Sequence, residues 1–130
     1  MNRLTVEVEH EWFGPCFNLM IDGEHICDVL ECAESGIPAW IAENGIPRYP
    51  VGATAPTPDD MRIVAVCGCS VEGCGHLRCE VRREGETVIF QNFVDEHGRP
   101  GKAARFVFSV LDFEAAERLI VETMSGIVKR

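Results

Sequence analysis

Four of the seven cysteines and one of the four histidines lie between residues 67 and 79, where the sequence reads C-G-C-S-V-E-G-C-G-H-L-R-C. Thiolates and imidazoles are the preferred ligands of Zn²⁺, and a structural zinc site needs four of them in a tetrahedron. The spacing offers Cys67, Cys69 and Cys74 as three ligands. Glycines between them allow the backbone to turn tightly. The stretch therefore predicts a zinc-capable knuckle of three cysteines.

Three residues are candidates for the fourth zinc ligand: His76, Cys79 and His97. Leu77, Cys79 and Val81 alternate with charged residues, which predicts a strand that turns Cys79 toward the core. His97 belongs to a polar loop and is preceded by two acidic residues, a setting in which a histidine is commonly a solvated side chain. The fourth ligand stays open at this point, and no other cofactor is indicated.

Two other interpretations fit the same cysteines. Cys67 and Cys69, one residue apart, can form a strained disulfide that is easily reduced, with His76 as the nearest group able to lower a thiol pKa. The chain would then be a thiol redox enzyme or sensor. Alternatively the cysteines are incidental, and the chain is an acidic protein-interaction module. The cysteines outside the cluster lie among apolar residues and are expected to be small buried hydrophobes: Cys16, Cys27 and Cys32.

Composition limits the classes of function. The formal net charge is −9, which disfavours nucleic acid and anionic membranes because phosphate binding needs clustered Lys and Arg. A basic protein partner or a homo-oligomer is compatible with it. The sequence has no signal-peptide pattern and no apolar run of membrane-spanning length, so we expect a cytoplasmic protein. It shows no catalytic triad order, phosphate loop or H-E-x-x-H motif, which leaves catalysis undecided and favours a non-enzyme.

The length of 130 residues predicts a single domain, residues 1–130. Alternating or β-branched runs predict strands at residues 4–8, 17–21, 62–66, 77–82, 87–93 and 106–110. A hairpin turn at Asp22-Gly23 is predicted to join the run 17–21 to a second strand in the apolar-rich run 24–30. Asp112 is the predicted N-cap of a helix that begins at Phe113. One buried stripe is predicted for this helix: Phe113, Ala116, Leu119, Ile120, Thr123 and Ile127. Trp40, in a proline-rich irregular segment, is expected to fill the core. The predicted fold is α+β, an antiparallel sheet of about five to seven strands with the C-terminal helix packed on one face.

Several of these features together resemble a family of small uncharacterised bacterial proteins of unknown function. The resemblance rests on the Asp22-Gly23 hairpin, the segment from Cys67 to Gly75, Gln91-Asn92-Phe93 with His97 and Arg99-Pro100 beyond it, and Phe106 to Phe108 before the last helix. It implies Cys67, Cys69, Cys74 and His97 as site positions, and it brings no assigned activity. The C-x-C-x4-C spacing alone also resembles the zinc motif that follows the catalytic domain of SET-type methyltransferases, but nothing else here is similar to that enzyme.

Overall fold

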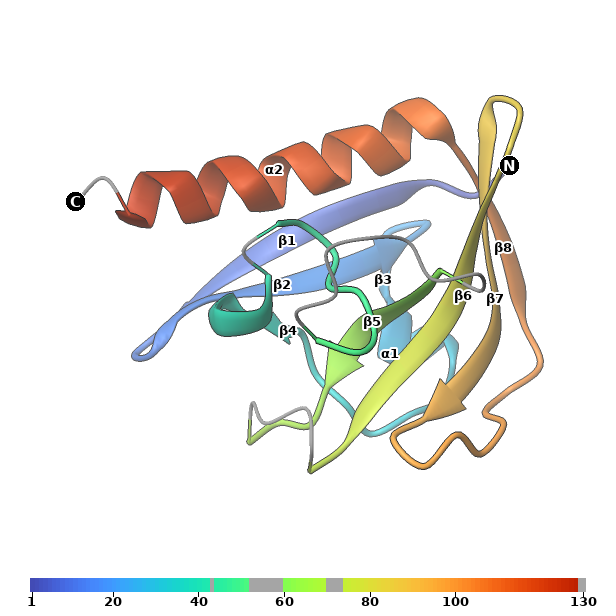
Figure 1. The fold of residues 1–130 in the computed structure, drawn as a ribbon, viewed down its shortest axis with the longest axis horizontal. Coiled ribbons are helices and arrows are strands. Elements are labelled where there is room, and N and C mark those ends of the chain that lie inside the picture. The colour runs from blue at the N-terminus through green and yellow to red at the C-terminus, as the bar shows by residue number, and fades with distance from the viewer. Residues whose placement is uncertain (43, 52–59, 70–73, 129–130) are drawn as a thin grey trace.

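A computed structural model describes residues 1–42, 44–51, 60–69 and 74–128, and it folds into two four-stranded antiparallel sheets and a long C-terminal helix (Figure 1). The first sheet contains β1 (Leu4–Glu11), β2 (Gly14–Ile21), β3 (Glu24–His25) and β4 (Ile37–Pro38). The second contains β5 (Met61–Val66), β6 (His76–Glu84), β7 (Thr87–Asp95) and β8 (Arg105–Ser109) in that order. The helical elements are α1 (Ile26–Val29), the 3₁₀ turn η1 (Ala39–Ile41) and α2 (Val110–Val128).

The α+β class, the antiparallel pairing and the C-terminal helix are confirmed, whereas the expectation of one sheet is met only in part. The prediction of a strand over residues 24–30 is wrong beyond His25, because the chain turns into α1 after the two residues of β3. The helix and the proline-rich segment after it interrupt the strand pairing. Two backbone hydrogen bonds link residues that precede strands of the first sheet to strands of the second. The N–H of Ser35 donates to Val66 O at 2.7 Å, and that of Asn2 donates to Val107 O at 2.8 Å.

The first hairpin follows directly from its turn residues. Asp22 and Gly23 both have positive φ, 52° and 85°, as a type I′ turn requires, and they join Ile21 to its partner Glu24. The prediction of a two-residue turn is confirmed. On β1 apolar side chains alternate with exposed polar ones, so one face of this strand contacts the core and the other faces solvent.

Both sheets and α2 contribute to one cluster of buried side chains. Phe17 of β2, Phe90 of β7 and Phe108 of β8 have no exposed surface, and the rings of Phe90 and Phe108 meet edge to face with their centroids 4.9 Å apart. Truncating an aromatic side chain at such a position typically costs about 3–5 kcal/mol. Side chains of β5 and β6 pack into this core. The cysteine knuckle connects the end of β5 to the start of β6.

The helix α2 begins earlier than the sequence predicts. Its cap is Ser109, whose Oγ accepts a hydrogen bond from Asp112 N at 3.0 Å, so the prediction of Asp112 as N-cap and Phe113 as first residue is wrong. The Asp112 carboxylate instead accepts bonds from Arg3 Nε at 2.9 Å and Leu4 N at 3.3 Å. These bonds fasten the helix start to β1, along which α2 runs in Figure 1.

The buried stripe of α2 is confirmed at three of its six predicted positions. Phe113, Ala116 and Ile120 are buried, whereas Leu119 is 39% exposed and Thr123 is half-buried. The side chain of Ile127 lies outside the described residues. The expectation for Trp40 is also wrong, because this side chain is 51% exposed on η1. Parts of the proline-rich segment, including Pro56 and Pro58, lie outside the described residues.

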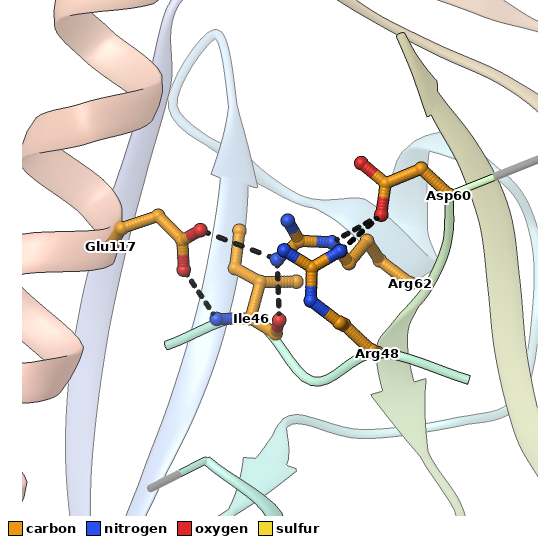
Figure 2. A network of polar contacts seen from close by, with 5 residues as sticks. All are labelled: Ile46, Arg48, Asp60, Arg62 and Glu117. Carbon is orange, nitrogen blue, oxygen red and sulfur yellow. Dashed lines mark hydrogen bonds and ion pairs between the residues drawn. The ribbon is translucent and has the colours of Figure 1, made fainter. Parts of the chain in front are cut away.

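A buried arginine anchors β5 to the rest of the molecule (Figure 2). Arg62 is only 7% exposed, and its Nε donates to Asp60 Oδ1 at 3.1 Å. Its Nη1 donates to Ile46 O at 2.8 Å and contacts Glu117 Oε1 of α2 at 3.3 Å. A buried guanidinium needs such partners because its desolvation is costly. The strand that leads into the knuckle is thereby held from two sides.

Candidate metal centre

The cysteine knuckle is the connection between β5 and β6. Cys67 follows directly after β5, and its N–H donates to Gly75 O at 2.7 Å, immediately before β6 begins at His76. This bond closes the loop, so the first and last cysteines of the knuckle lie at its base. Residues 70–73, which include Gly73, lie outside the described part of the chain.

The three predicted sulfur ligands converge. The Sγ atoms of Cys67, Cys69 and Cys74 all lie within 4.8 Å of one another. With Zn–S bonds of about 2.3 Å, two sulfurs of a tetrahedral site are separated by about 3.8 Å. A small contraction of the loop would therefore bring the three thiolates to bonding distance from one point. The donor set and its spacing fit a metal ion, and the group could hold one.

The knuckle lies at the surface. Cys67 is half-buried, and Cys69 and Cys74 are exposed. Hydrogen bonds from the Cys74 thiol to Cys69 and Cys67, together with repulsion between thiolates, raise the pKa of Cys74 to about 11. The sulfur group thus keeps a proton near neutral pH, which a metal would have to displace on binding. The short distances between these sulfurs would also allow thiol redox chemistry, in which two of them form a disulfide bond and no metal is bound.

His76 is close in sequence to the three cysteines, but its side chain contacts other residues. The residue is 4% exposed, its Nε2 lies 2.9 Å from Arg78 Nη1, and its ring centroid is 5.4 Å from that of Tyr49. Arginine can only donate, so this histidine nitrogen acts as an acceptor. His76 does not belong to the group of ligand atoms within 4.8 Å.

The other two candidates for a fourth ligand also lie outside that group. Cys79 has no exposed surface, and burial raises its pKa well above the ordinary value. Its predicted orientation toward the core is confirmed. His97 is on the polar loop after β7 with a side chain that is 68% exposed, and its Nε2 lies 3.6 Å from Glu96 Oε1. Within the described residues, the metal-ligand group thus consists of three sulfurs.

A second feature next to the knuckle was not predicted from the sequence. A cleft of about 530 Å³ lies between β1, β2, α1 and the segment before β4, and Gly68 of the knuckle forms part of its wall. Four carboxylates line it: Glu9, Glu11, Asp28 and Glu34. Among the described residues of its wall there is no lysine or arginine. The cleft therefore has a negative potential, which favours cationic ligands.

A chain of hydrogen bonds orders the floor of this cleft. Asn18 Nδ2 donates to Glu9 Oε1 at 2.7 Å, and Asn18 Oδ1 lies 2.9 Å from His25 Nε2. His25 Nδ1 accepts a bond from Cys27 N at 3.0 Å and so caps α1. Because Nδ1 accepts, the ring proton is on Nε2 and is donated to Asn18. Both ring nitrogens are thereby used for structure.

The three cysteines of this region differ in exposure. Cys16 and Cys27 are buried, at 9% and 4% exposed, which confirms their interpretation as interior residues. Cys32 is half-buried, so that interpretation is wrong for it. All three line the cleft. No pattern in the sequence marks this grouping, because the residues come from β2, α1 and the turn that follows α1.

Comparison with known proteins gave no match to a family model, to a curated protein or to a solved structure. The resemblance to small bacterial proteins of unknown function stays a prediction. In the described part of the chain, no helix combines the length and apolar character needed to cross a membrane. Conclusions about function therefore rest on the knuckle and the cleft.

Proposed function

We propose that this chain is a binding or regulatory module in which Zn²⁺ joins Cys67, Cys69 and Cys74. The observation that supports it is the convergence of the three sulfurs within 4.8 Å at the joined ends of β5 and β6. Bound Zn²⁺ would act as a cross-link that fixes the shape of the loop. Because two of the three cysteines are exposed, the fourth coordination position would face solvent and be accessible to a partner.

Metal analysis tests this proposal directly. Protein purified without added zinc is expected to contain close to one zinc per chain. Each of Cys67→Ser, Cys69→Ser and Cys74→Ser should lose most of it, since a zinc site deprived of one thiolate binds far more weakly. Cys32→Ser is the matched control, because it removes a half-buried thiol outside the group. Wild-type protein without near-stoichiometric metal would contradict the proposal.

Substituting the remaining candidates tests the fourth position. His97→Gln and His76→Gln are expected to retain zinc if solvent or a partner completes the site. Loss of zinc in either variant would identify the substituted histidine as the fourth ligand. Cobalt substitution adds an independent readout, because the intensity of thiolate-to-cobalt charge-transfer bands reports the number of bound sulfurs. Three thiolates are expected, and four would indicate that Cys79 or another cysteine moves into the site.

The acidic cleft favours a second candidate function, recognition of a basic partner. Trp12 and Phe13 line the cleft together with the four carboxylates, and Trp12 is 94% exposed. Trp40, which is 51% exposed, lies next to this wall through its contact with Phe13. The ring of Phe13 lies between them, with centroid distances of 5.4 Å to Trp12 and 5.5 Å to Trp40. Exposed aromatic groups beside carboxylates suit lysine and arginine side chains, which combine a charged head with an apolar stem.

Peptide titration tests this candidate. An oligolysine peptide should bind more tightly than a neutral peptide of equal length, and the difference should shrink as salt rises. Glu11→Gln and Glu34→Gln are expected to weaken binding, whereas Glu84→Gln, which removes a charge from the distant β6–β7 hairpin, should not. Equal effects of the three variants would show that only net charge matters and would contradict a specific cleft site.

A further inference from the structure

The short helix α1 ends in a way that brings two cysteines together. The N–H of Cys32 donates to Cys27 O at 2.9 Å, and that of Glu31 donates to Asp28 O at 3.4 Å. Glu31 has a positive φ of 56°. These are the paired bonds and the left-handed residue of a Schellman motif, in which the side chains of the first and last residues typically make an apolar contact. Here both residues are cysteines.

The two thiols are in contact and are chemically unequal. The side chains of Cys27 and Cys32 are hydrogen-bond partners, and Cys27 Sγ lies 3.8 Å from Ser35 O, which accepts a bond from it. The bond between the two thiols and burial raise the pKa of Cys27, whereas the same bond lowers the pKa of Cys32 by stabilising its thiolate. A half-buried thiol of lowered pKa beside a buried one is the arrangement of an attacking and a resolving cysteine.

Both cysteines line a cleft at the surface of the molecule. Cys27 and Cys32 line the acidic cleft of about 530 Å³, together with Glu34 and Asp28. A small molecule that enters the cleft meets Cys32 first, because Cys32 is half-buried whereas Cys27 is only 4% exposed. The carboxylates of the wall favour a molecule with positive charge and disfavour an anionic one.

We propose that Cys27 and Cys32 form a redox-active dithiol that reacts with positively charged disulfides in the acidic cleft. The Cys32 thiolate attacks one sulfur of the disulfide, forms a mixed disulfide and expels a thiolate, which takes up the proton that Cys32 released. Cys27 then loses its proton and attacks Cys32 Sγ, forming the Cys27–Cys32 disulfide and expelling the second thiol. The substrate disulfide is reduced to two thiols, and the two cysteines are oxidised. Neither cysteine belongs to the group of Cys67, Cys69 and Cys74, so the proposed reaction uses none of the proposed zinc ligands.

Oxidation of the native full-length protein by cystamine, a disulfide with two ammonium groups, tests the proposal. The sequence offers a direct readout, because cleavage after glutamate at Glu24, Glu31 and Glu34 places the two cysteines on separate peptides. A Cys27–Cys32 disulfide would leave these peptides joined until a reductant is added. We expect the joined peptides after cystamine treatment and separate peptides after reduction.

Two variants define the order of attack. Cys27→Ser should accumulate the mixed disulfide on Cys32, because no resolving thiol remains, and Cys32→Ser should leave Cys27 unmodified because it is buried. Cys16→Ser is the matched control, since Cys16 lines the same cleft, and it should form the Cys27–Cys32 bond as the wild type does. Circular dichroism verifies that each variant is folded, and peptide mapping of the wild type remains decisive if one of them is not.

The charge of the substrate is tested by comparing cystamine with dithiodipropionate, which carries two carboxylates. The quantity compared is the rate of reaction with cystamine divided by the rate with dithiodipropionate. At low salt this ratio should be at least about tenfold larger for the native protein than for the denatured chain. Equal ratios for the native protein and the denatured chain would overturn the assigned substrate class. Native protein in which both thiols remain free, or in which Cys32 pairs with Cys16 instead, would overturn the dithiol itself.

Discussion

Arg62 of β5 and Glu117 of α2 form an ion pair with 3.3 Å between Nη1 and Oε1, although 55 positions separate them in the chain. Both residues also form a hydrogen bond with the backbone of Ile46, in the loop that precedes β5. Ile46 N donates to Glu117 Oε2 at 2.7 Å, and Ile46 O accepts from Arg62 Nη1 at 2.8 Å (Figure 2). The pair therefore fastens helix, loop and strand at one point on β5, the strand that Cys67 directly follows.

Replacing Glu117 should destabilise the protein clearly. Glu117→Ala leaves the Arg62 guanidinium, which is 7% exposed, without one partner and removes the acceptor of Ile46 N. We expect the free energy of unfolding to fall by about 2–4 kcal/mol in urea titrations. Glu114→Ala is the control, because its 3.6 Å pair with Arg83 is about half exposed and should contribute less than about 1 kcal/mol. Equal losses would contradict this role of Glu117.

This network shows where sequence reasoning reaches its limit. The turn Asp22-Gly23 and the three-cysteine knuckle were predictable, because each depends on residues that are close in the chain. Arg62 is part of the predicted strand 62–66, and its acidic partner on α2 could be found only in three dimensions. The end of α1 was hidden for another reason. Its left-handed residue is Glu31 and not glycine, so nothing in the sequence indicated that Cys32 returns to Cys27.

Gly36 should tolerate no side chain. A Cβ at this position would lie 2.8 Å from the backbone oxygen of Phe17 and 2.5 Å from Asn18 Oδ1, and the backbone of a central strand cannot move away at small cost. Gly36→Ala is expected to lower the free energy of unfolding by about 1–3 kcal/mol.

Gly126 provides the opposite case for the same substitution. It lies in α2, and a Cβ there would have no neighbour within 4 Å. Gly126→Ala should raise the free energy of unfolding by about 0.5–1 kcal/mol through helix propensity. The two variants measured side by side in urea should therefore change stability in opposite directions, and a neutral Gly36→Ala would show that the first sheet is more adaptable than its packing indicates.

Removing metal should loosen the knuckle and leave the fold intact. The core cluster is formed by side chains of both sheets and α2, and it includes none of the three knuckle cysteines. A bound ion adds stability only through its preference for the folded state. A chelator should lower the Tm of zinc-loaded wild type, while cooperative unfolding persists. The Tm of a Cys67→Ser/Cys69→Ser/Cys74→Ser variant should not respond. Loss of the folded circular dichroism signal on chelation would instead make zinc essential for folding, as in zinc fingers.

Asp95 should make stability depend on pH through the loop that carries His97. Its Oδ1 accepts bonds from His97 N and Arg99 N, both at 2.9 Å, and its Oδ2 accepts one from Arg99 Nε at 2.9 Å. These bonds, that of Arg99 N foremost, lower the pKa of Asp95 below its ordinary value of 3.8. A carboxyl whose pKa is lower in the folded state stabilises the fold fully above its ordinary pKa, and this contribution is lost as the pH falls through the folded pKa.

Asp95→Asn should consequently lower Tm at about pH 7, and the difference from wild type should shrink as the pH falls below about 3.8. Thermal unfolding followed by circular dichroism over this range measures both parts of the expectation. Glu86→Gln, at an exposed position in the β6–β7 turn, removes the same charge without removing this set of bonds and serves as the control. A Tm difference for Asp95→Asn that stays constant down to the acid limit would contradict this expectation, because protonation of Asp95 in the wild type would then not reproduce the loss that the substitution causes.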